Sequence, residues 1–162
     1  MKFRNDGETM KIVVMSDSHG CNSEIEYVLN NEKDADMFLH CGDICVDQYV
    51  YPDLISVRGN NDYYDYPMQR IINLKKHRIL MLHSHTISFM KREEYLVKNA
   101  KEHGCDIVCF GHTHIALVKE MQGVHLVNPG SLYCSRDGRS PSYAVIEVED
   151  DKINIKIKFL EE

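Results

Sequence analysis

The sequence predicts an α/β sandwich, in which two sheets pack face to face and helices cover their outer faces. Three observations support this prediction. Strands and a helix alternate in the first half of the chain, strand-like segments lie in pairs in the second half, and each early strand runs into a polar turn. A chain of 162 residues has the usual length of one domain, and its 43% of apolar residues can form a substantial core.

The first half contains apolar runs that are short enough for buried strands. These runs cover residues 11–15, 37–40 and 54–57. A helix is expected between the first two runs, because Ser23 and Glu26 have the spacing of a capping box. Its apolar residues Ile25, Val28 and Leu29 lie on one helical face.

The second half reads as strand pairs around one charged helix. The expected pairs are residues 69–74 with 77–83, 115–120 with 124–127, and 143–148 with 153–159. The charged helix covers about residues 92–103, and Gly104 is expected to end it as a C-terminal cap. Residues 106–110 form one further apolar strand.

Domain organisation and location follow from the absence of special segments. We interpret residues 1–9 as an N-terminal extension that need not be ordered, with Met10 as an alternative start, and residues 10–162 as a single domain. The sequence has no apolar run of the roughly 18 residues that span a membrane, and no signal-peptide pattern. We therefore expect a cytoplasmic protein without a membrane partner, whose six scattered cysteines are reduced thiols.

The net charge limits the classes of partner. A formal charge of −6 argues against a protein that grips long nucleic acid through a basic face. It does not exclude a phosphate substrate, because bound divalent cations would reverse the local field.

Polar clusters follow the predicted strands, at the position where open α/β sheets place their sites. They are Asp17-x-His19, Gly42-Asp43, Gly59-Asn60-Asn61-Asp62, His83-x-His85 and Gly111-His112-Thr113-His114. Side chains at positions i and i+2 of an extended segment point the same way. Asp17 and His19 are therefore expected to address one metal, and His112 and His114 one cavity. Carboxylate, imidazole and amide ligands without thiolate suit Mn, Fe, Zn, Ni or Co.

Each cluster alone has a plainer interpretation. The Asp17 and Asn60 clusters are typical of turns, and a pair of histidines can lie on a surface or in a core. Their occurrence together at strand ends favours a metal site. The histidines outside the clusters are interpreted as structural: His40, His77, His103 and His125. Arg136 is a candidate phosphate contact, although a surface role is favoured, and Asp62 either orients a ligand histidine or stabilises its turn.

In this order, the motifs resemble those of the calcineurin-like metallophosphoesterases. The matching segments are Asp17-Ser18-His19-Gly20, His40-Cys41-Gly42-Asp43, Gly59-Asn60-Asn61-Asp62, His83 and Gly111-His112-Thr113-His114. Asn128-Pro129-Gly130-Ser131 is similar to a further loop of the small, single-domain phosphodiesterases in that superfamily. The resemblance covers about residues 10–159 and implies a four-layer fold, with two mixed sheets flanked by helices.

The resemblance also implies a dinuclear site with named ligands. The first metal would be held by Asp17, His19 and His114, the second by Asn60, His83 and His112, and Asp43 would bridge them. The catalytic residues would be Asp43, Asn60, His83 and His112. The cofactors would be two divalent ions, with manganese expected and Ni, Zn, Fe or Co as alternatives. A hydroxide between the ions would attack the phosphorus in line.

Two positions depart from the family pattern. Ser84 stands where many members have glycine after the metal-binding histidine. Asn61 stands where the phosphoprotein phosphatases have a histidine that is thought to protonate the leaving group. An amide cannot act as an acid, so the general acid stays unassigned and the small phosphodiesterase branch is favoured.

The expected activity is hydrolysis of small organic phosphate esters or nucleotides by a metal-dependent phosphodiesterase. A protein-binding scaffold similar to the retromer subunit of this fold is the first alternative, and a nuclease is the second. The presence of all four candidate histidines favours the enzyme over the scaffold. The loops at residues 63–66 and 134–140 are expected to influence substrate choice, and homo-oligomerisation stays open.

Overall fold

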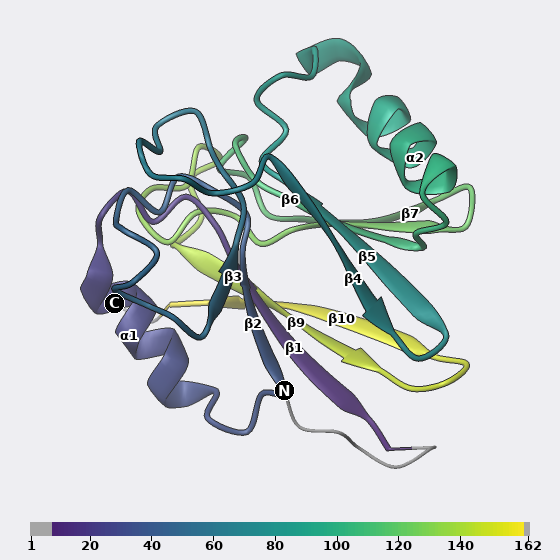
Figure 1. Ribbon diagram of the computed structural model, residues 1–162, viewed down its shortest axis with the longest axis horizontal. Helices are drawn as coiled ribbons and strands as arrows, with labels where there is room; N and C mark the ends of the chain where they lie inside the picture. Colours follow the sequence, from purple (N-terminus) through teal and green to yellow (C-terminus); the bar gives the residue numbers. More distant parts are fainter. Residues whose placement is uncertain (1–7, 161–162) are drawn as a thin grey trace.

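The computed structural model describes residues 8–160, and two five-stranded sheets face each other in it (Figure 1). The first sheet has the order β10-β9-β1-β2-β3, and the second has the order β4-β5-β6-β8-β7. The strands of the first sheet are β1 (Met10–Met15), β2 (Met37–His40), β3 (Leu54–Ser56), β9 (Ser142–Val148) and β10 (Ile153–Phe159). Those of the second are β4 (Gln69–Leu74), β5 (His77–Leu82), β6 (Ile107–Phe110), β7 (Leu117–Met121) and β8 (Val124–Asn128).

Both sheets combine parallel and antiparallel pairs. In the first sheet β1, β2 and β3 are parallel, whereas β9 runs antiparallel to β1 and pairs with β10. In the second sheet β5, β6 and β8 are parallel, whereas β4 and β7 are antiparallel edge strands. The parallel strands of each sheet therefore end at one edge, where the polar loops begin.

Helices cover the outer faces of both sheets. The helix α1 (Asn22–Asn31) packs on the first sheet through Ile25 and Val28, with Leu29 partly buried beside them. The short 3₁₀ turn η1 (Phe89–Lys91) leads into α2 (Arg92–Glu102), which covers the second sheet. Alternate residues of β1 serve different layers, since Ile12 faces the opposite sheet and Val13 faces α1. The predicted four-layer α/β/β/α sandwich of two mixed sheets is confirmed.

The predicted capping box of α1 is wrong. The helix starts at Asn22, its N-cap is Cys21, and that residue makes no side-chain capping bond. Ser23 already lies inside the first turn and donates its hydroxyl to Glu24 instead (2.7 Å). The reason is the loop before the helix, because Gly20 takes a left-handed conformation (φ +82°) and the chain turns into the helix earlier than the sequence pattern indicates.

The ends and the surface add little to the site. The predicted extension at residues 1–9 lies mostly outside the described residues, and β1 begins at Met10. No helix within residues 8–160 is both long and apolar enough to cross a membrane.

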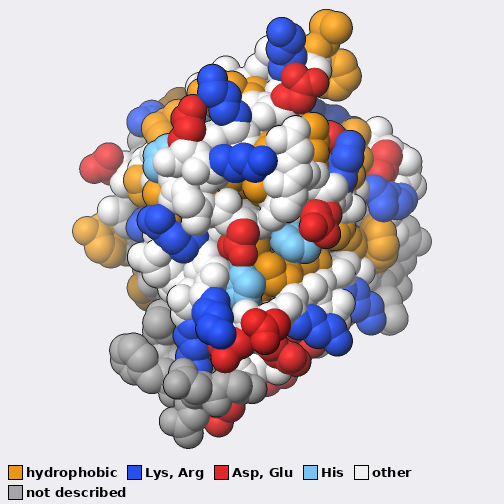
Figure 2. Space-filling view, turned by 90° about the vertical axis from the view of Figure 1, so that its right-hand side faces the viewer, with side chains coloured by type: hydrophobic (Ala, Val, Ile, Leu, Met, Phe, Trp, Pro, Cys, Tyr) orange, Lys and Arg blue, Asp and Glu red, His pale blue; other side chains and the backbone are white. Residues whose placement is uncertain are grey.

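On the face that carries the β4–β5 and β9–β10 turns, the described Lys and Arg side chains are interspersed with Asp and Glu (Figure 2). This face therefore has mixed charge.

Candidate metal centre

The polar loops after β1, β2, β3, β5 and β6 gather at one end of the two sheets (Figure 1). Several of their residues take left-handed backbone conformations, which are uncommon for residues other than glycine. They are Asp17 (φ 53°), His19 (φ 46°), Asp43 (φ 56°), His112 (φ 74°) and His114 (φ 58°). The expectation that these segments are extended is therefore wrong. The side chains still converge, because each loop turns sharply at the strand end.

Close approach of these loops requires glycine at two positions. A Cβ atom on Gly59 would lie 2.1 Å from Oδ1 of Asp43. A Cβ atom on Gly111 would lie 2.0 Å from Oγ of Ser16. Both distances are far below van der Waals contact, so each glycine lets a neighbouring loop bring its carboxylate into the centre.

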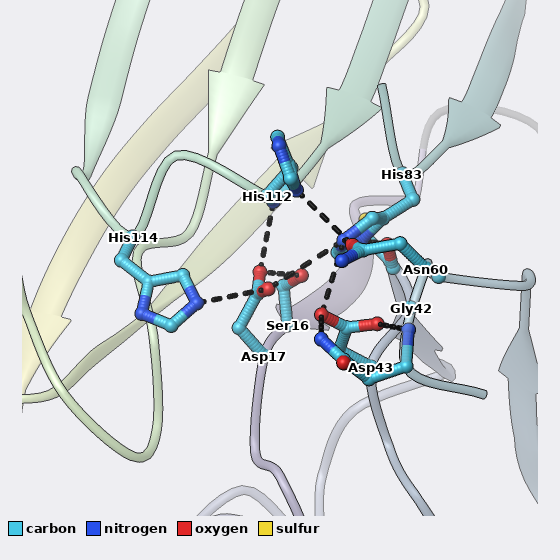
Figure 3. A network of polar contacts seen from close by, with 12 residues as sticks. Ser16, Asp17, Gly42, Asp43, Asn60, His83, His112 and His114 are labelled. Carbon is cyan, nitrogen blue, oxygen red and sulfur yellow. Dashed lines mark hydrogen bonds and ion pairs between the residues drawn. The ribbon is translucent and has the colours of Figure 1, made fainter. Parts of the chain in front are cut away.

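The first group of side chains surrounds Asp17, which is fully buried (Figure 3). Its Oδ1 lies 3.2 Å from Nε2 of His114 and 3.9 Å from Nε2 of His19. The Nε2 atoms of His19 and His114 are themselves 3.3 Å apart. The other oxygen, Oδ2, accepts hydrogen bonds from the Ser16 hydroxyl (2.5 Å) and the His112 backbone N–H (3.0 Å). Oδ1 is left facing the two imidazoles.

The second group surrounds Asn60 and Asp43 (Figure 3). Oδ1 of Asn60 lies 3.0 Å from Nε2 of His83 and 3.2 Å from Nδ1 of His112. Oδ2 of Asp43 lies 3.3 Å from Nε2 of His83 and 3.6 Å from Nε2 of His19. The Asp43 carboxylate thus faces one histidine from each group.

Two backbone carbonyls fix the orientation of the inner histidines. Nδ1 of His83 donates to the carbonyl of Cys41, and Nδ1 of His114 donates to the carbonyl of Cys134, both at 2.8 Å. A carbonyl only accepts, so Nδ1 carries a proton in each ring and Nε2 is the nitrogen that faces the centre. This is the usual arrangement of a histidine that binds a metal.

The residues present fit divalent cations. Oδ1 of Asp17 is buried but accepts no hydrogen bond of regular geometry, and an ion would satisfy it. Two sets of side chains could each hold an ion, because the ligand atoms within each set lie within 4.8 Å of one another. One set is Asp17 with His19 and His114, and the other is Asp17 with Asp43 and His83. Carboxylate, imidazole and amide donors without thiolate suit borderline divalent metals.

The electrostatics keep the carboxylates ionised and the outer imidazole neutral. Burial alone would raise the pKa of Asp43, but His83 and the N–H donors of Asn61 hold that pKa well below its usual range. Burial, aided by the charge of His83, lowers the pKa of His112 to about 4. At neutral pH an ionised Asp43 and a neutral His112 are in the states that metal ligands need. Burial lowers the pKa of His83, but the neighbouring carboxylates of Asp43 and Asp17 raise it above its ordinary value.

Asp62 stabilises its turn and does not orient a ligand histidine. It is 3% exposed, and its carboxylate accepts three backbone N–H bonds, from Asp43 (2.8 Å), Cys45 (2.9 Å) and Gly59 (2.7 Å). Of the two roles expected from the sequence, the turn-stabilising role agrees with these contacts. Through them Asp62 sets the backbone on both sides of Asp43.

Other supporting residues were not identified from the sequence. Asn61 donates to both oxygens of Asp43, from its backbone N–H (2.8 Å) and its side-chain amide (2.9 Å). Ser131, in the Asn-Pro-Gly-Ser loop, donates to the carbonyl of Asp17 (2.7 Å). In the sequence, Ser131 is marked only by the Asn-Pro-Gly-Ser motif, and Asn61 only by its position next to Asn60.

The remaining predicted positions have defined places. His85 is half-buried with its ring 5.4 Å from that of His83, and it belongs to neither candidate ligand set. Arg136 lies beside the centre, since its Nη1 donates to the carbonyl of His112 (3.4 Å). Ser84 takes a left-handed conformation (φ 82°), which explains why a glycine is common at this position.

The histidines interpreted as structural include two with clear partners. His40 is fully buried, and burial lowers its pKa to about 4. Its Nδ1 accepts the N–H of Gly42 (3.2 Å), and its Nε2 therefore donates to Ser18 (2.9 Å), which ties the first two loops together. His77 pairs with Asp106 (2.6 Å) at the opposite end of β5.

An α/β/β/α sandwich with carboxylates and imidazoles converging at the strand ends defines a metal-dependent phosphoesterase class. Residues 10–151 match the calcineurin-like phosphoesterase superfamily domain, and the chain belongs to that superfamily. It is 31% identical over 152 residues to the probable metallophosphoesterase YsnB of Bacillus subtilis, covering 91% of this chain and 89% of the relative.

One solved structure supports the same conclusion, and a second has the same fold. A predicted phosphoesterase from Streptococcus pneumoniae superposes with a TM-score of 0.85 at 28% identity, over 93% of this chain and 89% of that one. Vps29 from Entamoeba histolytica superposes with a TM-score of 0.78 at 23% identity, over 91% of each chain. The second similarity extends to the fold alone.

Proposed function

We propose that this protein is a phosphodiesterase that hydrolyses small organic phosphate esters or nucleotides with two divalent cations. The proposed ligands of one cation are Asp17, His19 and His114, and those of the other are Asn60, His83 and His112. Asp43 lies between the groups and is proposed as the bridge. The proposal rests on the position of the Asp43 Oδ2 atom. This atom lies 3.3 Å from Nε2 of His83 and 3.6 Å from Nε2 of His19.

Manganese is the proposed metal, with Ni, Zn, Fe and Co as alternatives of similar ligand preference. When bound, the cations provide a nucleophile at neutral pH by lowering the pKa of a water and withdraw charge from the phosphoryl oxygens. A structure of Vps29 from Entamoeba histolytica with Zn²⁺, at 21% identity and a TM-score of 0.75, has the same fold. That similarity supports the proposal that this fold can hold a metal ion.

The protein's own residues have positioning roles in this reaction. The carbonyls of Cys41 and Cys134 keep the imidazoles of His83 and His114 turned inward. Asn61 holds both oxygens of Asp43. Because an amide cannot protonate the leaving group, esters with good leaving groups such as phenols are proposed to react fastest.

The direct test is an activity screen with the purified chain loaded with Mn, Ni, Co or Zn. We expect p-nitrophenol release from bis(p-nitrophenyl) phosphate, and EDTA should stop it. Asp43→Asn should lower kcat/KM by more than about 100-fold, since it changes a direct ligand. The matched control is Asp53→Asn on an exposed loop residue. Absence of activity with all four metals, or full activity of Asp43→Asn, would exclude the proposal.

A non-catalytic scaffold is the second candidate, and the fold similarity to Vps29 favours it. The complete set of carboxylate and imidazole donors favours the enzyme instead. A nuclease is the third, and assays with single- and double-stranded DNA beside nucleotide esters distinguish it. We also propose a cytoplasmic location, which the six free cysteines support.

A further inference from the structure

A pocket of about 540 Å³ opens beside the candidate metal centre, between η1, the start of α2 and the strand ends of the second sheet. Its walls include Phe89, Arg92, Phe110, His112, Ile115 and Arg136. Pockets of roughly 300–1,000 Å³ are typical of small-molecule sites. None of the catalytic roles proposed above uses this space.

The pocket and the candidate metal centre share the side chain of His112. That side chain lines the pocket, while its Nδ1 lies 3.2 Å from Oδ1 of Asn60. Arg136 lines the same wall and donates to the carbonyl of His112. An organic group attached to a phosphate at the centre can therefore extend past His112 into the pocket.

The walls combine apolar and cationic groups. Phe110 is buried and contributes an apolar wall, whereas the ring of Phe89 is 84% exposed and Ile115 is 40% exposed. Nε of Arg92 is buried and has no hydrogen-bond partner among the described residues. Glu93 also lines the pocket, but Lys119 pairs with it at 2.7 Å, so the arginines determine the local charge.

These features favour one class of ligand. An aromatic ring matches the exposed Phe89 and the apolar wall, since stacked aromatic pairs attract each other beyond the effect of burying their area. An acceptor on that ring matches the Arg92 guanidinium, whose side chain lines the pocket, because hydrogen bonds from a charged donor are the strong ones. A purely aliphatic group would make neither contact.

We propose that this pocket binds the organic group of the phosphate ester, an aryl or nucleobase ring that carries a hydrogen-bond acceptor. Phe89 contacts the ring and Arg92 donates to its acceptor. This proposal depends on the proposed function in one respect, namely that the phosphate of the ester binds at the metal centre.

The kinetic test uses two diesters with the same leaving group, bis(p-nitrophenyl) phosphate and methyl p-nitrophenyl phosphate. They differ only in the retained group, so the ratio of their kcat/KM values reports on the pocket. We expect Phe89→Ala and Arg92→Gln each to lower this ratio about five- to tenfold. Met90→Ala is the matched control, since Met90 is 87% exposed in the same turn and does not line the pocket. An unchanged ratio in both pocket variants overturns the proposal while leaving the hydrolase intact.

A binding test separates failure of the pocket from failure of the enzyme. Calorimetry on the full chain with Mn²⁺ compares AMP with ribose 5-phosphate, which lacks the base. We expect AMP to bind at least about tenfold more tightly, and Phe89→Ala to remove that difference. Equal affinities in the wild-type chain overturn the pocket proposal. A base-dependent difference without hydrolysis of any diester supports the pocket and excludes the proposed function.

Discussion

At the scale of single residues, the centre depends on how Asp43 is held. Asp62 fixes the backbone around it through three N–H bonds, and Asn61 holds its two carboxylate oxygens. At the position where the phosphoprotein phosphatases have a histidine, this chain therefore has a residue that holds the Asp43 carboxylate. The departure noted in the sequence has a structural role here.

Asn61→Ala should weaken metal binding because Asp43 loses one of its fixed donors. Loss of such a partner of a metal ligand costs about 10- to 100-fold in affinity. Calorimetric titration with Mn²⁺ measures the effect, and the exposed Asn73→Ala serves as the control. Equal affinity of Asn61→Ala and the wild type would show that the amide has no positioning role.

Gly59→Ala should remove metal binding by displacing Asp43, whose Oδ1 would lie 2.1 Å from the new methyl group. Gly123→Ala provides the contrast, because its methyl group meets nothing within 4 Å but its φ is +80°. That variant should lose about 1 kcal/mol of stability and keep its activity. Urea unfolding and the diester assay measure both effects. Normal Mn²⁺ binding by Gly59→Ala would contradict the required close approach.

At the scale of the elements, Glu32 joins α1 to the first sheet. It caps the end of the helix, is 2% exposed, and binds Lys11 of β1 (2.6 Å), Lys158 of β10 (2.7 Å) and the hydroxyl of Tyr143 on β9 (2.7 Å). Burial opposes the charge, but these partners lower the pKa of Glu32 to about 2.

This depressed pKa predicts an acid-dependent loss of stability. The contribution of Glu32 is fully present above its ordinary pKa of 4.5 and is lost as the pH falls from there through about 2. The shift corresponds to about 3 kcal/mol. Glu32→Gln should therefore destabilise the fold at pH 7 and much less near pH 2, as measured by urea unfolding. A difference that stays constant between these pH values would contradict this linkage.

From the sequence, the helices and strands were predicted more accurately than the helix start and the loops that connect them. Strands and helices were found within a few residues, because their periodicity is local. The capping box at Ser23 failed because the left-handed Gly20 starts the helix early. The grouping of the site residues was predicted from their positions at the strand ends, and the structure agrees. The further expectation that Asp17 and His19, or His112 and His114, lie on extended segments was wrong, since these residues take left-handed conformations. The pocket beside His112 joins four segments that are separate in sequence, and no local pattern indicates it.

At the scale of the whole molecule, bound metal should stabilise the folded state, because the ligands converge only when both sheets are formed. A ligand at 100 times its Kd adds about 2.7 kcal/mol, which is about 5–11 °C in Tm for a chain of this size. Thermal unfolding with and without Mn²⁺ measures this shift. EDTA should reverse it, and Asp17→Asn should remove most of it. An equal shift in Asp17→Asn would place the binding elsewhere.

The position of β9 has a consequence for biosynthesis. The strand β1, which leads directly to Asp17, lies between β2 and β9, and its register pairs Ile12 with Ile146. Contacts between residues so far apart in the chain close late and slow folding. During translation, β1 has no β9 partner until residues 142–148 have left the ribosome. Until then, the edge of β1 that pairs with β9 is unpaired in the nascent chain, and unpaired strand edges favour aggregation.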